Sequence, residues 1–488
     1  MAKKSITKNY IYNTAYQILT LILPLITTPY VSRVLGAENI GIYSFTISIA
    51  TYFILFGTLG ISMYAQREIA YVQDDLNKKS KIFWEIILLR FITMGISIIV
   101  FYFVYINGTE YQVYYKILVL ELIAVTLDIT WFFQGIEDFK KTVIRNIIVK
   151  IISIVSIFIF VKTQDDLVNY LLIYALSDVI ANISLWLYLP KYIKKIKIHD
   201  LKITKHLKPT IGLFIPQIAM QVYTLLDKVM LGYIIEDKTE VGYYDQAQKI
   251  IKMLLTVVTS LGTVMLPRMA NTFIKGDNKK LKEYMKKSFS FVFFLSIPMI
   301  FGIIVVSKNF VPIFFGEGYE NVALVMNVIS PILLIIGISN VIGTQYLLPT
   351  KRQKEFTISV VCGAIVNFVA NMILIKNYGA VGASIATVIA EAIVTSTQIY
   401  FVRKDIDISY IFKKIKNYLI AGFIMFIVCY LIKFINLTGI VLILIQVLIG
   451  TIVYLAILIL LKDEFLNYLL EKVKNIINKK KKLIKNIN

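Results

Sequence analysis

Residues 205–268 read KHLKPTIGLFIPQIAMQVYTLLDKVMLGYIIEDKTEVGYYDQAQKIIKMLLTVVTSLGTVMLPR, and this segment repeats the pattern of residues 8–67. Each copy passes from a basic segment into an apolar run that a proline interrupts, Pro24 in the first copy and Pro216 in the second. Apolar runs of about 20 residues are long enough to cross a bilayer as helices. The duplication therefore predicts a membrane protein with two related halves that face each other across a pathway.

The two copies agree in the order of their motifs. The paired motifs are Leu35-Gly36 with Leu231-Gly232, Gly41-Ile42-Tyr43 with Gly242-Tyr243-Tyr244, Leu59-Gly60 with Leu261-Gly262, and Arg67 with Arg268. The tyrosines (244 − 43) and the arginines (268 − 67) are each 201 residues apart, whereas the two prolines (216 − 24) are 192 apart. The copies have therefore diverged while keeping a common plan.

The composition is that of an integral membrane protein. Of the 488 residues 58% are hydrophobic, about what fourteen spans of roughly 20 residues require. The two cysteines, Cys362 and Cys429, both lie in apolar runs, and the two histidines share one basic loop. Neither a disulfide framework nor a metal site is supported, and we expect no cofactor. Residues 1–9 are too polar for a cleaved signal peptide.

Fourteen apolar segments predict an all-α integral membrane protein. We expect spans near residues 10–33, 40–64, 82–106, 113–134, 142–162, 167–189, 209–234, 241–266, 288–307, 320–348, 355–375, 379–401, 417–435 and 439–461. They form two pseudo-symmetric six-helix lobes, at 1–189 and 209–401. A basic linker joins the lobes at 190–208, two further helices occupy 402–461, and a Lys-rich tail follows at 462–488.

The net charge of +22 is sorted by side of the membrane. Segments on the side of the termini carry 40 of the 52 Lys and Arg residues, and the opposite segments carry five. By the positive-inside rule, both termini and the linker are cytoplasmic. The basic residues are dispersed over loops without a base-reading motif, so we expect contact with anionic lipid and not with nucleic acid.

Four motifs in this order resemble a known family. They are RVLGAENIGIY at 33–43, QGxxxF at 134–139, DKVMLG at 227–232 followed by GYY at 242–244, and YGAVGA at 378–383. The chain resembles the polysaccharide transporter branch of the multidrug, oligosaccharidyl-lipid and polysaccharide exporter superfamily. Its members are flippases for lipid-linked O-antigen, capsule or exopolysaccharide repeat units.

The resemblance implies more than the residues alone. It implies a V-shaped pair of six-helix lobes that work by alternating access. It also implies a substrate, undecaprenyl diphosphate bearing an oligosaccharide, which is flipped outward across the bacterial inner membrane. The implied partners are this lipid-linked oligosaccharide, membrane lipids and other polysaccharide-assembly proteins. No enzymatic activity is implied.

Basic residues at membrane depth are candidates for binding the diphosphate of the lipid carrier. Ionisable groups at this depth cost several kcal/mol unless they face protein, water or a partner. The candidates are Arg90, Lys150, Lys228 and Lys252. Cations in a cleft would offset the cost of moving a charged headgroup through low dielectric. The alternative for Arg90 and Lys150 is that their long side chains reach back to the interface.

Five further charged residues are candidates for coupling or gating. These are Asp178, Glu391, Asp227, Asp128 and Arg33. Asp178 and Glu391 lie near mid-span, where a coupling role competes with a plain interhelical hydrogen bond or ion pair. Asp227 and Lys228 either form part of a gate or flank a helix interface. For Arg33 the alternative is an ordinary charge at the membrane boundary.

Three functions from different classes remain open. The first is the lipid-linked oligosaccharide flippase. The second is a multidrug antiporter of the same superfamily, which would favour an acidic lumen, whereas Arg90, Lys150, Lys228 and Lys252 favour an anionic cargo. The third is a polysaccharide polymerase or ligase, which would need a sizeable outward loop with catalytic residues. The longest outward segment, about 307–320, is short, and no phosphate-binding Gly-rich lysine loop is present.

Overall fold

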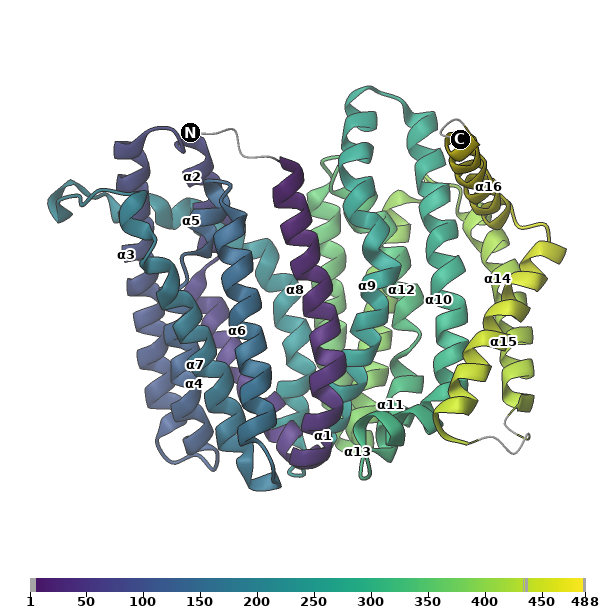
Figure 1. Ribbon diagram of the computed structural model, residues 1–488, viewed down its shortest axis with the longest axis horizontal. Helices are drawn as coiled ribbons and strands as arrows, with labels where there is room; N and C mark the ends of the chain where they lie inside the picture. Colours follow the sequence, from purple (N-terminus) through teal and green to yellow (C-terminus); the bar gives the residue numbers. More distant parts are fainter. Residues whose placement is uncertain (1–5, 433, 435–437, 486–488) are drawn as a thin grey trace. The chain divides into compact units, whose positions relative to one another are not determined.

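The computed structural model describes the backbone of residues 6–432, 434 and 438–485, which is all-helical between its turns (Figure 1). Within these ranges, the side chains of 6–18, 21, 198, 213, 215–217, 219–220, 222–223, 408, 410–412, 473 and 476–485 are not described. Pro216 of the second copy is among them, so its side chain lies outside the described residues. The chain divides into two compact units, Met1–Gly242 and Tyr243–Asn488. The lobe boundaries predicted from the sequence stay a prediction.

The first unit contains eight α-helices among its described residues. They are α1 (Ile6–Thr58), α2 (Ile61–Tyr71), α3 (Leu76–Phe101), α4 (Gln112–Leu127), α5 (Thr130–Gly135), α6 (Phe139–Phe160), α7 (Leu167–Trp186) and α8 (Leu207–Ile234). Helix α4 packs along α7, and α1 packs on α3, α4, α6 and α8. Where α2, α3 and α5 meet, Phe83 stacks on Trp131 at 5.5 Å between ring centroids. Both rings are buried in an apolar core that also includes Ile61 and Phe132.

The second unit begins within α9 (Thr239–Ile274). Its remaining described helices are α10 (Asn278–Phe315), α11 (Glu320–Ile329), α12 (Ile332–Ser339), α13 (Gln353–Val402), α14 (Ile408–Ile432), α15 (Gly439–Leu460) and α16 (Glu464–Lys485). Helices α14 and α15 pack on each other and on α10 (Figure 1). Phe289 and Phe293 of α10 form their core with Tyr418 and Tyr454.

The predicted fourteen crossings are confirmed once the two longest helices are divided. Eleven described helical stretches are long and apolar enough to cross a membrane. Helix α1 has 53 residues and α13 has 50, about 75 Å or more of helix, over twice the thickness of the hydrocarbon core. Each leaves helical geometry at one glycine, Gly36 (φ 77°) and Gly379 (φ 52°), so each supplies two crossings. Helix α8 is the fourteenth.

Three features differ from the sequence prediction. The span expected at 113–134 is interrupted at Asp128 and Ile129. The span expected at 320–348 is interrupted at Ser330 and Pro331. It continues as α12 and then as a π-helix over Asn340–Leu347. Polar groups from neighbouring helices compensate the first break, which an apolar sequence pattern does not reveal. Helix α10 extends to Phe315, so the segment after it, which was predicted to face outward, shrinks to residues 316–319. The Lys-rich tail begins with α16.

Candidate functional site

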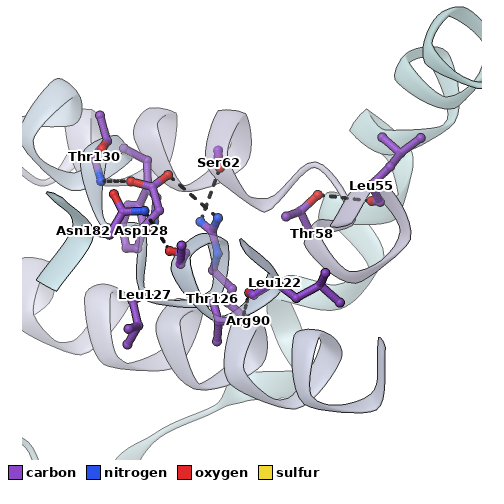
Figure 2. Close-up of polar contacts among 12 residues, drawn as sticks. Leu55, Thr58, Ser62, Arg90, Leu122, Thr126, Leu127, Asp128, Thr130 and Asn182 are labelled. Carbon is purple, nitrogen blue, oxygen red and sulfur yellow. Dashed lines mark hydrogen bonds and ion pairs between the residues drawn. The ribbon is translucent and has the colours of Figure 1, made fainter. Parts of the chain in front are cut away.

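Arg90 is the most deeply buried of the predicted cationic residues. It lies fourteen residues (90 − 76) into α3, about 21 Å from the start of that helix, and its side chain is 1% exposed. Figure 2 shows the guanidinium pointing toward Ser62 of α2 and Asp128, at the break between α4 and α5. Nη2 lies 3.8 Å from Asp128 Oδ2, and Nη1 donates to Ser62 Oγ at 3.4 Å. The structure therefore brings together two residues that the sequence analysis assigned to different roles.

Asp128 stabilises the interruption of the fourth predicted span. Its backbone is extended (φ −68°, ψ 115°), so it ends α4. Oδ1 accepts a hydrogen bond from the Thr130 amide at 2.8 Å, and its carbonyl accepts one from Trp131 Nε1 at 3.1 Å. Backbone groups freed by the break are thus satisfied by protein, as a lipid environment requires. The remaining carboxylate oxygen faces Arg90.

Arg145 supports the same break from α6, and the sequence analysis did not single it out. Its Nη1 donates to the Ala181 carbonyl at 2.6 Å and to Asn182 Oδ1 at 3.1 Å, and its Nη2 lies 3.5 Å from Thr130 Oγ1. Asn182 Nδ2 in turn donates to the Ala124 carbonyl at 2.8 Å. Arg145 is six residues from the start of α6 and was counted with the loop charges. Only its tertiary partners distinguish it from them.

The contacts of Arg90 leave hydrogen-bonding capacity unused. A guanidinium carries five N–H donors, and those of Arg90 make two long contacts. Among the described residues, no acceptor lies within hydrogen-bond reach of Nε. A buried cation in this condition gains several kcal/mol from a further acceptor, because an unsatisfied charged donor is costly at low dielectric. The position is chemically suited to an anionic group.

The other predicted residues of the first unit are spread over several helices. Lys150 is half-buried on α6, and Asp178 is exposed on α7, where it experiences the charges of Lys150 and Arg145. Asp227 is buried on α8 and Lys228 is half-buried beside it, whereas Arg33 is exposed. Asp178 is therefore electrostatically associated with the basic residues of α6.

In the second unit a chain of polar contacts links the repeated Gly-x-Tyr motif to Lys252. The exposed Lys252 donates from Nζ to Gln248 Oε1 at 2.9 Å, and Gln248 Nε2 donates to the Tyr244 hydroxyl at 3.2 Å. The Tyr244 hydroxyl lies 2.9 Å from Thr387 Oγ1 of α13. Glu391 is buried one turn beyond Thr387 on the same helix face.

Among the described residues, no group of three or more His, Cys, Asp or Glu side chains could hold a metal ion. The buried carboxylate of Glu85 on α3 was also missed by the sequence analysis. It lies near the predicted start of its span, where a charged residue is unremarkable, and its partners come from a segment more than 100 residues away.

Comparisons with known proteins place the chain among membrane transporters. A family described as polysaccharide biosynthesis protein matches residues 6–273, and the MatE family matches residues 213–373. The chain is 28% identical over 408 residues to the putative O-antigen transporter of Escherichia coli (strain K12), covering 83% of this chain and 98% of that one.

Two solved structures share the fold. One is the lipid II flippase MurJ in an inward closed conformation, with a TM-score of 0.77 and 20% identity over 93% of this chain and 99% of that one. The other is a multidrug resistance MATE family transporter in an inward-facing conformation, with a TM-score of 0.62 and 11% identity over 80% and 96%. At these identities the likeness establishes the fold, and the predicted all-α fold is confirmed.

Proposed function

We propose, from the premise that the chain belongs to the polysaccharide biosynthesis protein family, that it is a flippase for a lipid-linked oligosaccharide. In the proposed reaction an undecaprenyl-diphosphate-linked repeat unit passes from the inner to the outer leaflet of the bacterial cytoplasmic membrane. The match over 98% of the length of a putative O-antigen transporter carries this proposal. The relatives are transporters and not enzymes, in agreement with the sequence prediction.

The protein is a multi-pass membrane protein. Its proposed orientation, with both termini in the cytoplasm, follows from the distribution of Lys and Arg along the sequence. The linker at 190–208 is then cytoplasmic as well.

The proposed mechanism gives the diphosphate a cationic binding site. Arg90 is its first candidate, because its guanidinium is buried and makes only long contacts to Ser62 and Asp128. Binding then requires an exchange of partners, in which a phosphate oxygen takes the place of the Asp128 carboxylate. Lys150, Lys228 and Lys252 remain candidates for binding the diphosphate headgroup as it crosses the membrane during alternating access. The polyprenyl chain stays in lipid throughout.

A second candidate function is export of cationic drugs, favoured by the match of the MatE family to residues 213–373. This function predicts that a buried acidic group binds the cargo. Asp227 and Glu391 are buried carboxylates of this kind, but among the predicted site residues the buried group whose hydrogen-bonding capacity is left unused is the Arg90 guanidinium. An arginine is suited to phosphate and repels an organic cation. The flippase is therefore the better supported of the two.

The deciding experiment is deletion of the gene, followed by analysis of lipid-linked saccharides. We expect an undecaprenyl-diphosphate saccharide to accumulate on the inner leaflet and surface polysaccharide to disappear. A plasmid copy should restore both. The double variant Arg90→Ala, Lys150→Ala should insert normally and fail to restore them, whereas Lys404→Ala, which removes an exposed cation, should succeed. Drug sensitivity without saccharide accumulation would favour the antiporter and refute the flippase.

A further inference from the structure

The basic linker between the two repeats is docked on one face of α3. The Lys194 amide donates to Ser80 Oγ at 2.9 Å, and the Lys194 carbonyl accepts from Trp84 Nε1 at 3.0 Å. Further along, the Lys202 amide donates to Glu85 Oε1 at 2.8 Å. Ser80 and Trp84 lie one helical turn apart and Glu85 directly follows Trp84, so the three contacts cover about 140° of the circumference of α3. The linker is thus held by specific side-chain contacts along α3.

Glu85 is the centre of this docking. Its side chain is fully buried, and its Oε2 is shared by Lys205 Nζ at 2.6 Å and His206 Nε2 at 2.9 Å. On the far side of the imidazole, Nδ1 of His206 lies 2.7 Å from the hydroxyl of Tyr64 on α2. His206 directly precedes α8, and its carbonyl accepts from Thr210 Oγ1 in the first turn. The cluster therefore joins α2, α3 and the start of α8.

Both ring nitrogens of His206 have a partner in either protonation state. Because the Glu85 carboxylate is an acceptor, Nε2 of the neutral ring carries the proton and Nδ1 accepts from the Tyr64 hydroxyl. In the imidazolium form Nδ1–H donates to the same hydroxyl. Proton uptake thus reverses the hydrogen bond between Tyr64 and Nδ1, keeps the two partners in place, and adds one positive charge.

The charge of the cluster is balanced only when His206 is neutral. The single negative charge of Glu85 is then matched by Lys205. Protonation of His206 places a second cation on the same carboxylate oxygen. The charge of Glu68 of α2 also acts on the ring, and Glu68 is paired with Arg67 at 3.1 Å, which offsets its charge.

Burial lowers the pKa of His206, because the charged imidazolium is less favourable away from water. The hydrogen bond to Glu85 raises this pKa but does not offset the effect of burial. Because the pKa of His206 is lower when the linker is docked, neutral His206 stabilises the docked state fully at pH values above the ordinary histidine pKa, about 6.5. This stabilisation is lost as the pH falls through the lowered value. Acid should therefore weaken the docking of the linker.

We propose that Glu85, His206 and Tyr64 form a proton-binding site that controls the docking of the linker onto α3. With His206 neutral, the linker is docked and α8 is anchored to α2 and α3. Proton uptake releases the linker, α8 loses this anchor, and transport slows. The last step alone rests on the proposed flippase function, whereas docking and release are properties of the first unit.

Hydrogen–deuterium exchange of the full-length protein in nanodiscs tests the site without a substrate. The peptide that contains the Lys202 amide is followed between pH 5 and 8, after correction for the intrinsic pH dependence of exchange. Protection should fall below about pH 6.5, by up to tenfold per pH unit, and should level off once the pH is below the lowered pKa of docked His206. His206→Gln should remain protected throughout, because a glutamine amide can donate to Glu85 and accept from Tyr64 without titrating. An unchanged pH profile in His206→Gln would overturn the proposal.

Lys205→Gln tests the sign of the effect. Removing the competing cation leaves the imidazolium alone with Glu85, which should shift release of the linker to lower pH by about one unit or more. A shift to higher pH would contradict the charge balance on which the site depends. Glu85→Gln should lower protection of the linker at every pH, and an unaltered protection would show that Glu85 does not hold it.

A flipping assay on the same samples separates the two proposals. Wild-type protein should flip a lipid-linked saccharide more slowly at pH 5.5 than at pH 7.5, and His206→Gln should lose most of this difference. Protein that shows the expected exchange profile but flips no saccharide at any pH would refute the flippase and leave the proton site standing. Flipping with a wild-type pH profile in His206→Gln would refute the control of transport.

Discussion

At the scale of single residues, Asp128 is the carboxylate that would compete with a bound anion for Arg90 under the proposed function. Its Oδ1 accepts from the Thr130 amide, and its Oδ2 faces the guanidinium. Asp128→Asn keeps an oxygen for Thr130 and removes the charge that competes for Arg90. We expect this variant to bind the diphosphate headgroup more tightly and to release it more slowly, measured as retention of lipid-linked saccharide on the purified protein. Unchanged binding would place the headgroup away from Arg90.

Arg90→Ala removes the other member of the pair. The loss leaves Asp128 partly buried without its cation, and we expect the free energy of unfolding to fall by about 1–3 kcal/mol. In the double variant Arg90→Ala, Asp128→Asn the loss should be smaller than the sum of the single losses. Thermal unfolding in detergent gives all three values. Additive losses would mean that the two side chains do not interact.

The repeated Gly-x-Tyr motif has a steric reason at both glycines. A Cβ built on Gly41 would lie 1.7 Å from the Lys238 carbonyl oxygen, and one on Gly242 would lie 2.1 Å from the Ala37 carbonyl oxygen. Backbone atoms cannot move aside cheaply, so Gly41→Ala should lower the melting temperature markedly. Gly95→Ala on α3 is the matched control, because nothing lies within 4 Å of its Cβ. Equal stability of the two variants would refute the close approach.

At the scale of elements, each unit has a cation at the start of one crossing that contacts the end of the next crossing, on α6 and after α7 in the first unit and at the two ends of α13 in the second. In the first unit Lys141 of α6 contacts Asp138 and the Tyr192 hydroxyl, which follows α7. In the second, Arg352 precedes α13 and contacts Glu355 and Asp405 at 2.5 Å each, and it donates to the Phe401 carbonyl at 2.9 Å. In each unit a basic side chain therefore joins two helix ends that are distant in sequence.

Arg352→Lys should weaken this tie in the second unit. A lysine cannot contact Glu355, Asp405 and the Phe401 carbonyl at once, because it lacks the planar fork of arginine. We expect a loss of about 0.5–2 kcal/mol in the free energy of unfolding, reduced by the partial exposure of these groups. Lys354→Ala, at an exposed neighbouring position, should change little. Differential scanning fluorimetry compares the two variants directly.

At the scale of the whole molecule, the distribution of charge predicts the orientation in the membrane. In a background of Cys362→Ser and Cys429→Ala, a cysteine at position 279 should react with an impermeant maleimide only from the cytoplasmic side. A cysteine at position 317 should react only from outside. Labelling of whole cells and of inverted vesicles distinguishes the sides. The reverse pattern would overturn the orientation and move the linker with His206 out of the cytoplasm.

The sequence by itself determined the fold class, the fourteen crossings and the approximate ends of most helices. These are local properties, because the length of an apolar run is set by the thickness of the bilayer. For the same reason the non-helical glycines lie at the predicted span ends, Gly36 between two predicted spans and Gly379 at the first residue of one. The family predicted from four motifs was confirmed. The assignment of the charged residues to substrate binding or coupling stays a prediction.

The tertiary structure alone decided which polar groups meet. Arg90 with Asp128, Arg145 with Asn182, and Glu85 with His206 pair residues 37 to 121 positions apart. In lipid, apolar helix faces gain little by packing on one another, so hydrophobicity does not select neighbouring helices. Close packing and a few interhelical polar contacts make that selection. The break at Asp128 persists because side chains from α3 and α6 satisfy it, and those partners exist only in the folded protein.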